Sequence, residues 1–397
     1  MNKRLEVLVV GASVAGAATA LALARRGHTV RVFERRGGET ALGAGVVLWP
    51  NASFVLSELG LLSEVRAVAR TPPALRRYDD GGSALGAWDI TLLDGAMGFP
   101  SLAVLRADLQ RTLFAALRRA GVVVEHGRTA SRVEACPDAP GRARVIWADG
   151  SLDAADLVVG ADGRMGSVAG RYVRGQHTPV YQGFVNWVGT AETQDELFND
   201  GAVHDYWGIG RRFGIVPVSA GRVYWAAGQA MVSPPPGEPR GEFHEELQRL
   251  VASWPPAVAA ALAESRPENI RRIPLYDVEP QRPWHRGAVL LVGDAAHASL
   301  PTSGQGAAQA LEDAWHLARL LDETRDGLDA TLTTFAEVRF GKTRWMTQAA
   351  RQLARSLFNE DPHACEQRNA AARAADHRNT VKTLAASWGE GLPLAGR

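Results

Sequence analysis

The chain has 397 residues, 46% of them hydrophobic, which is enough for one large two-part body or for two domains. Its formal net charge is +1, so the overall charge attracts neither nucleic acid nor an anionic membrane. The lysines are Lys3, Lys342 and Lys382, and none lies between residues 4 and 341. This gap excludes a catalytic lysine or a pyridoxal Schiff base from the body of the chain.

The cysteines and the N-terminal residues indicate the compartment. Cys136 and Cys365 are isolated and form no C-x-x-C pair, which predicts two ordinary thiols in a reducing, cytoplasmic environment. Residues Val7–Ala24 resemble a signal peptide, but Gly11 and Gly16 interrupt the apolar run where a nucleotide-binding fold requires glycine. We therefore expect no membrane span.

The first elements predict a strand, a glycine turn, a helix and a second strand. Leu5–Val10 is the first strand, Gly11–Gly16 the turn, Ala17–Arg26 the helix and His28–Phe33 the second strand. Glu34 follows, 23 residues after the first glycine. The glycines allow a tight turn and a close approach of helix and strand, so that the helix N-terminus faces a pyrophosphate. Glu34 is placed to accept hydrogen bonds from a ribose, which predicts a dinucleotide site.

The middle of the chain alternates helical and strand-like stretches. Residues Trp49–Asn51 predict a turn with proline at a helix start, and residues 78–98 predict antiparallel hairpins. A helix is expected over Arg106–Arg119, followed by short strands that run into Gly160–Gly163. Residues 180–230 are rich in alternating runs with Trp and Tyr, which predicts a β-rich insertion.

The stretch Gly287–Ala314 predicts a buried strand, a glycine loop and a helix. The apolar run Ala288–Val292 breaks at Gly293–Asp294, and the loop carries Pro301, Gly304 and Gly306 before helical spacing returns. Such a junction directs backbone N–H groups and a positive dipole end toward an anion or an electron-rich ring. After about residue 332 the sequence is rich in Ala and Arg and predicts helices, which fade out in a polar tail at Gly389–Arg397.

Three blocks stand in a familiar order: GASVAG…FER at Gly11–Arg35, GADG at Gly160–Gly163, and GDAAHASLPTSGQGAAQALEDA at Gly293–Ala314. They resemble the p-hydroxybenzoate hydroxylase-type, or group A, flavoprotein monooxygenases, over nearly the whole chain to about residue 340. The resemblance implies an α/β fold: a Rossmann-like (GR2-type) FAD-binding domain, discontinuous in sequence, with an antiparallel β-sheet substrate domain and C-terminal helices. We expect the FAD-binding domain at 1–73, 98–178 and 272–340, the substrate sheet at 74–97 and 179–271, and the helical segment at 341–397.

The resemblance also implies the residues that hold FAD. Glu34 and Arg35 contact the adenosine half, Arg106 reaches the flavin side, and Asp294 binds the ribityl chain. The loop Pro301–Ala308 lies along the isoalloxazine, with Pro301 beside the face that reacts with oxygen. The full set is Gly11, Ser13, Ala15, Gly16, Glu34, Arg35, Val47, Arg106, Asp162, Gly163, Asp294, Pro301, Gly304, Gln305, Gly306, Ala307 and Ala308.

Two departures from the family pattern stand out. Ser13 replaces the middle glycine, a substitution that the pattern tolerates. The second block usually reads D-G-x-x-S-x-x-R, whereas here one extra residue follows Asp162-Gly163. The extra residue shifts Ser167 and Arg171, so only Asp162 and Gly163 are carried over from this block, which the family also associates with the nicotinamide cofactor.

The activity that the resemblance implies is a monooxygenation. NADH or NADPH reduces FAD, O₂ adds to give a flavin C4a-hydroperoxide, and an electron-rich aromatic or polycyclic small molecule is hydroxylated or epoxidised. No metal is expected, because His297 has no second ligand at helical or hairpin spacing and is interpreted as part of the loop fold. The expected partners are the substrate and O₂, without nucleic acid, and the chain is expected to be a monomer or homodimer.

Two further residues are candidates for substrate or proton handling. Residues Tyr181–Gly189 resemble flavoprotein urate and salicylate-type hydroxylases, in which an arginine and a tyrosine hold the substrate. At the matching positions stand Arg212 and Tyr224, on two runs that predict paired strands. With Pro301, they form the expected catalytic set.

Four other functions were weighed against the monooxygenase. A flavin-dependent halogenase is excluded because the body lacks a lysine and a W-x-W-x-I-P segment, and a Baeyer–Villiger enzyme because no second dinucleotide fingerprint follows. An FAD-dependent reductase or oxidase of the geranylgeranyl-reductase type, without oxygen transfer, stays open. So does a flavin-binding chaperone or regulatory partner without turnover.

Overall fold

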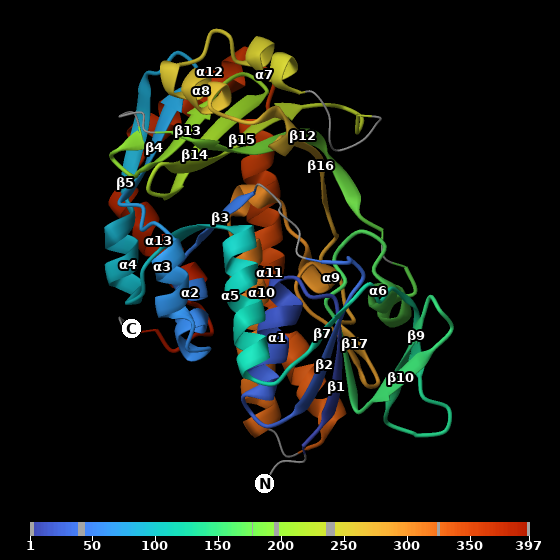
Figure 1. The fold of residues 1–397 in the computed structure, drawn as a ribbon. Coiled ribbons are helices and arrows are strands. Elements are labelled where there is room, and N and C mark those ends of the chain that lie inside the picture. The colour runs from blue at the N-terminus through green and yellow to red at the C-terminus, as the bar shows by residue number, and fades with distance from the viewer. Residues whose placement is uncertain are drawn as a thin grey trace.

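The computed structural model describes residues 4–38, 44–176, 178–193, 198–235, 243–323 and 326–394. Its architecture rests on two sheets, a mostly parallel one in the lower half of Figure 1 and a mostly antiparallel one in the upper half. The long helix α11 (Leu328–Leu357) runs beside both halves. Near its upper end, Arg351 donates two hydrogen bonds, of 2.6 and 3.0 Å, to the buried carboxylate of Asp277 in the upper sheet.

The lower sheet has six strands, and all of its pairings are parallel except the one between its two edge strands, β17 and β18. In spatial order they are β17 (His285–Arg286), β18 (Val289–Leu291), β11 (Leu157–Gly160), β1 (Glu6–Val10), β2 (Thr29–Glu34) and β7 (Val124–His126). The central strands are continuous apolar runs, as expected of a parallel sheet with both faces covered. The expected β–turn–α–β unit is present within one to three residues of its predicted bounds.

Helices and a small sheet cover this core. The helices α1 (Val14–Ala24), α5 (Arg106–Arg119) and α10 (Gly306–Glu323) pack together, since the alanines of α1 allow close approach. Elsewhere α6 (Val168–Arg174) contacts β18 and a three-stranded sheet of β8 (Ala130–Ala135), β9 (Ala143–Trp147) and β10 (Leu152–Ala155). The remaining elements of this half are β3 (Gly45–Leu48), α2 (Pro50–Glu58), α3 (Leu62–Val68), β6 (Leu102–Leu105), α9 (Asp294–His297) and the 3₁₀ turn η3 (Pro301–Ser303).

The upper sheet has seven strands, with one face packed on helices and the other turned toward the lower half. In spatial order they are β16 (Arg271–Asp277), β12 (Val180–Glu192), β15 (Arg222–Ala230), β14 (Arg211–Ser219), β13 (Val203–Trp207), β4 (Ala74–Asp79) and β5 (Ala84–Asp89). Trp187, Phe213 and Trp225 form a buried core with α7 (His244–Leu250) and α8 (Pro256–Ala263). These aromatic side chains are therefore structural.

One local expectation was wrong. The run Ile90–Leu92, predicted within a hairpin strand, begins the helix α4 (Ile90–Met97), because the Asp89 side chain accepts a hydrogen bond from the Thr91 N–H and caps it. After α12 (Pro362–Ala374) and α13 (His377–Gly389), Leu392 and Leu394 are buried in the main core.

Two of the expected domain limits fall at the start of, or within, a continuous strand or helix. Residue 271 begins β16, which pairs with β12 in the upper sheet, and residue 340 lies within α11. The remaining short element is the 3₁₀ turn η2 (Pro267–Asn269). Among the described residues, no helix combines the length and apolarity that a membrane crossing requires.

Candidate active site

The glycine turn after β1 is built for close approach. Gly11 has φ +103°, and a Cβ there would overlap the Ala161 carbonyl. A Cβ on Gly16 would overlap the carbonyl oxygen of Gly11, so neither position tolerates a side chain. Ser13 is the N-cap of α1, is exposed and makes no capping hydrogen bond. The helix N-terminus thus presents its first-turn N–H groups at the surface of the turn, which suits an anion.

Glu34 ends β2 beside this turn. Its carboxylate accepts hydrogen bonds from the Ala12 and Arg36 N–H groups, both at 3.0 Å. Arg35 is exposed next to it. The two backbone bonds fix the Glu34 carboxylate at the carboxyl edge of the sheet, where its remaining lone pairs suit the hydroxyls of a ribose.

Asp162 has a role that the sequence did not suggest. Its Oδ1 accepts a hydrogen bond from the Ser167 hydroxyl at 2.6 Å, and its Oδ2 accepts from the Val168 and Ala169 N–H groups at 2.6 and 3.1 Å. Ser167 in turn accepts from the Gly170 N–H. The extra residue therefore leaves Asp162 and Ser167 joined, and the Asp162 carboxylate caps α6. Gly163 beside it has φ +78° and open space where a Cβ would stand.

The turn after β18 packs directly on the glycine turn. A Cβ on Gly293 would lie 2.5 Å from the Cβ of the buried Ala15. This contact brings Asp294 to the same edge as Gly11. Asp294 is half-exposed, and its Oδ2 accepts a hydrogen bond from Arg164 at 2.6 Å. Arg164 was absent from the predicted set.

The loop Pro301–Ala308 joins this edge to the two long helices. The Thr302 hydroxyl donates to the Ala350 carbonyl of α11 at 2.7 Å. Gly304 has φ +63°, and its missing Cβ would lie 2.9 Å from Nε1 of Trp49. Pro301 and Gly306 are exposed, Ala307 is half-buried and Ala308 is buried. The N-terminus of the 18-residue helix α10 is thus open at Gly306.

Gln305 points away from this opening. Its side chain is fully buried, and its Oε1 accepts hydrogen bonds from Asn51 and Gln309 at 2.9 and 3.2 Å. The predicted cofactor role of Gln305 can therefore belong only to its backbone. The side chain belongs to a buried polar network beneath the loop.

That network was missed by the sequence reading. Arg339 donates to Glu312 at 2.6 Å and to Asp313 at 2.8 Å, and Lys342 donates to Glu312 at 2.9 and 3.0 Å. Asp313 also accepts from the Gly293 N–H at 2.8 Å and lies 2.7 Å from His297 Nε2. Burial raises the pKa of Asp313, but His297 and Arg339 more than offset it, so that pKa lies well below its usual range. His297 therefore belongs to the loop fold, as interpreted from the sequence.

The upper sheet turns a second polar group toward the loop. Arg212 and Tyr224 lie on β14 and β15, and Arg212 Nε donates to the buried carboxylate of Asp205 at 2.6 Å. Burial lowers the pKa of Arg212, and Asp205 reverses this, so the net shift is upward. Burial raises the pKa of Tyr224 to about 12, although the charges of Arg106 and Arg212 oppose it. The structure thus brings Arg106 and Arg212 within electrostatic reach of Tyr224.

The strand β3 of the lower half contacts the upper sheet. A Cβ on Gly45 would lie 2.7 Å from the Tyr224 ring. Val47 is half-buried on the same strand, which pairs with β6, and Arg106 follows β6 as the first residue of α5. The lower-half residues expected at the flavin therefore adjoin the upper-sheet residues expected at the substrate.

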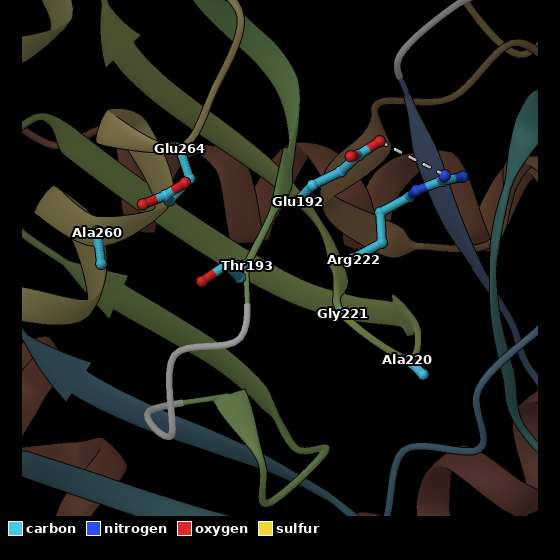
Figure 2. A pocket seen from close by; sticks show the side chains of 7 residues that line it. All are labelled: Glu192, Thr193, Ala220, Gly221, Arg222, Ala260 and Glu264. Carbon is cyan, nitrogen blue, oxygen red and sulfur yellow. Dashed lines mark ion pairs between the residues drawn. The ribbon is translucent and has the colours of Figure 1, made fainter.

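A separate surface hollow lies at the turn between β14 and β15, beside α8 (Figure 2). It is lined by Glu192, Thr193, Ala220, Gly221, Arg222, Ala260 and Glu264. The Arg222 guanidinium lies 3.7 Å from the Glu192 carboxylate within it. It includes none of the predicted site residues, which lie instead where the two sheets meet.

The junction fits FAD. The glycines at 11 and 16 permit the tight backbone packing that a dinucleotide-binding turn requires, and Gly163 and Gly306 have open space where a Cβ would stand. Among the described residues, no group of three His, Cys, Asp or Glu side chains is arranged to hold a metal ion.

Comparison with known proteins decides the family. The family described as "FAD binding domain" matches residues 4–348. A 3-amino-4-hydroxybenzoate 2-monooxygenase of Streptomyces cremeus is 33% identical over 386 residues, 94% of this chain and 93% of that protein. The chain belongs to the FAD-dependent aromatic monooxygenases of the p-hydroxybenzoate hydroxylase type. The resemblance seen in the sequence is confirmed, and FAD is the cofactor.

Other members of the family agree in sequence and in fold. An FAD-dependent urate hydroxylase of Klebsiella pneumoniae is 31% identical over 372 residues, 91% of this chain and 93% of that protein. The crystal structure of Klebsiella pneumoniae HpxO complexed with FAD and uric acid superposes with a TM-score of 0.89 at 26% identity, covering 98% of this chain and 97% of that one. The predicted fold class is confirmed, and the comparisons favour oxygen transfer over the reductase alternative and over a flavin-binding protein without turnover.

Proposed function

We propose that this FAD-dependent monooxygenase hydroxylates a planar, electron-rich aromatic small molecule, held on the substrate face of the upper sheet, with NADH or NADPH and O₂ as co-substrates. The observation that carries the proposal is the convergence of Arg106, Arg212 and Tyr224 beside the strand β3. The relatives act on molecules of this kind, since their names specify 3-amino-4-hydroxybenzoate and urate.

The substrate face carries small residues between Arg212 and Tyr224. In the register of the upper sheet, Arg212 lies opposite Gly228, Gly214 opposite Ala226, and Val216 opposite Tyr224. Residues directly opposite each other share a face, so small residues lie between the arginine and the tyrosine. Asn186, also opposite Gly228, has a buried Oδ1 without a hydrogen-bond partner among the described residues. This face therefore offers a cation, a phenol and an amide acceptor, with small residues between the arginine and the tyrosine.

Each group has a physical task. Bound FAD supplies the transfer of electrons from the nicotinamide to O₂ and the activated oxygen that reaches the substrate. The chain supplies position and charge: Arg212, fixed by Asp205, pairs with an electron-rich or anionic substrate. Tyr224 remains protonated and donates a hydrogen bond. The open N-terminus of α10 at Gly306 stabilises negative charge on the flavin edge.

The proposal also assigns the two halves. The parallel sheet with its helices binds FAD, and the seven-stranded sheet, β16 included, binds the substrate. A cytoplasmic location suits the supply of NAD(P)H and the free Cys136 and Cys365.

The test is a substrate panel. Purified enzyme loaded with FAD is given amino- and hydroxybenzoates, urate, hydroxynicotinate and quinolines, and substrate-stimulated oxidation of NADH and of NADPH is followed by absorbance. Mass spectrometry then scores products for one added oxygen, with ¹⁸O₂ as its source. We expect at least one compound to show both signals. NAD(P)H oxidation that releases only hydrogen peroxide with every compound would contradict the substrate class.

A further inference from the structure

Arg164 occupies a position that the established chemistry of the site does not use. It lies in the altered block after β11, and its Nη1 donates to Asp294 Oδ2 at 2.6 Å across 130 residues of sequence. The side chain of Arg164 is 26% exposed to solvent, and that of Asp294 is 44% exposed. Both side chains therefore remain accessible to a ligand at this edge.

The order of the strands places Arg164 between two parts of the cofactor site. Parallel strands β18, β11, β1 and β2 are neighbours in that order, so their carboxyl ends form one edge. Along it follow Asp294, Arg164, the glycine turn at Gly11–Gly16 and Glu34. A dinucleotide lying along such an edge with its ribose at Glu34 and its pyrophosphate at the glycine turn passes β11 before it reaches Asp294.

The surroundings of Arg164 leave its remaining donors for a ligand. A guanidinium has five N–H donors, and in the described part of the chain its side-chain partner is Asp294. The neighbouring Asp162 does not compete, because its carboxylate is occupied by the cap of α6. Gly163 and Gly166, with φ +78° and +74°, flank the residue and have open space in place of a Cβ. The loop thus carries the arginine without covering it.

We propose that Arg164 is an FAD-binding residue that holds Asp294 for the ribityl hydroxyls with one donor and neutralises a phosphate of the pyrophosphate with the others. The inference rests on the proposed function, since it takes FAD as the occupant of this edge. Bidentate and charge-assisted hydrogen bonds of arginine to phosphate are stronger than neutral ones, which suits this position.

The test is an equilibrium titration that needs no turnover. Flavin is removed from the purified enzyme, and the apoprotein is titrated with FAD while flavin fluorescence is followed. We expect Arg164→Ala to raise the Kd for FAD at least tenfold and Arg164→Lys to restore part of it, because the charge returns without the planar fork. The matched control is Arg171→Ala, an exposed arginine that bonds to the Gly166 carbonyl of the same loop. Its Kd should stay within twofold of the wild type.

A second titration with riboflavin separates the two contacts. Riboflavin has the ribityl chain but no phosphate, so Arg164→Ala should weaken riboflavin by a smaller factor than FAD. A Kd for FAD within twofold of the wild type, or an equal loss for Arg171→Ala, would overturn the assignment. So would an unchanged Kd with a raised KM for NAD(P)H, which would give Arg164 to the nicotinamide. If the wild-type apoprotein itself failed to bind FAD, the proposed function would fail instead.

Discussion

The polar residues on the substrate face depend on one another. Asp205 accepts hydrogen bonds from both Arg212 Nε at 2.6 Å and Trp207 Nε1 at 2.9 Å, so this buried carboxylate fixes the arginine from behind. Asp205 was not a predicted site residue. The sequence had no sign of it, because its role depends on the pairing of β13 with β14. In the proposed site, Asp205 is a positioning residue, and Arg212 and Tyr224 are the groups that touch the substrate.

Removing the tyrosine hydroxyl should slow hydroxylation without loss of flavin. We expect Tyr224→Phe to lower kcat/KM by about 100-fold to 1,000-fold, the range for loss of one catalytic hydrogen-bond donor. Arg212→Ala should mainly raise KM, because it removes the charge that holds the substrate. The measurements are initial rates of product formation and the FAD content per chain. Unchanged turnover in both variants would exclude these two residues from the site.

The pH dependence offers a check within the same experiment. Because the pKa of Tyr224 is raised to about 12, the phenol stays protonated throughout the usual assay range. The pH profiles of kcat/KM for the wild type and for Tyr224→Phe should therefore have the same shape between pH 6 and 9. Disappearance of a basic limb in that variant would mean that the hydroxyl ionises during turnover.

At the scale of elements, a buried lysine holds the C-terminal segment against the core by hydrogen bonds to its backbone. Lys342 on α11 donates to the Trp388 and Glu390 carbonyls at 2.7 and 2.9 Å while its ammonium also pairs with Glu312 on α10. The Trp388 ring lies 5.0 Å from that of Trp49, which adjoins Gly304 of the loop Pro301–Ala308. One buried ammonium thus connects the tail, α10 and α11.

Replacing this lysine should destabilise the protein strongly. Lys342→Met leaves two backbone carbonyls and part of the Glu312 charge without a donor, and removal of one member of a buried ionic group costs about 3–5 kcal/mol. The free energy of unfolding is measured by urea titration. The matched control is Lys382→Met, an exposed lysine on α13, which should change it by less than about 0.5 kcal/mol. Equal effects would show that the carbonyl contacts of Lys342 do not matter.

A buried histidine on α10 should make the fold sensitive to acid. Burial, the first cause, lowers the pKa of His316 to about 2, with the charge of Arg339 adding to it. In the unfolded chain the imidazole takes up a proton near pH 6.5, whereas in the folded protein it does not. Stability is therefore lost as the pH falls below 6.5, at up to about 1.4 kcal/mol per pH unit.

Replacing that histidine isolates the effect. His316→Phe should flatten the loss of unfolding free energy between pH 6.5 and 4.5, while the exposed His363→Phe should leave the slope unchanged. Most of this window lies above about pH 5, below which the unfolded chain begins to protonate carboxylates whose pKa is lowered in the folded protein, such as that of Asp313. Parallel slopes for wild type and His316→Phe would show that the imidazole is charged in the folded state.

At the scale of the molecule, what the sequence predicted was local. The glycine turn, Glu34 and Asp294 were found because their spacing along the chain carries the signal, and the fold class followed from the order of the blocks. The ion pair of Arg164 with Asp294 joins residues 130 apart, and the bonds of Arg339 and Lys342 to Glu312 span 27 and 30. Such contacts depend on how strands and helices pack in three dimensions, so no local sequence pattern predicts them.

FAD should stabilise both halves together. The cofactor edge includes the loop at Pro301–Ala308, which the Thr302 hydroxyl ties to α11, and Arg351 of α11 binds Asp277 in the upper sheet. Ligand that binds only the folded state adds RT ln(1 + [L]/Kd), about 2.7 kcal/mol at 100 times Kd. Apoprotein with saturating FAD should therefore melt several degrees higher in a single transition, followed by circular dichroism and by Trp fluorescence. Asp294→Ala should show a smaller rise at the same FAD concentration. Two separate transitions, with FAD raising only the one, would show that α11 does not couple the sheets.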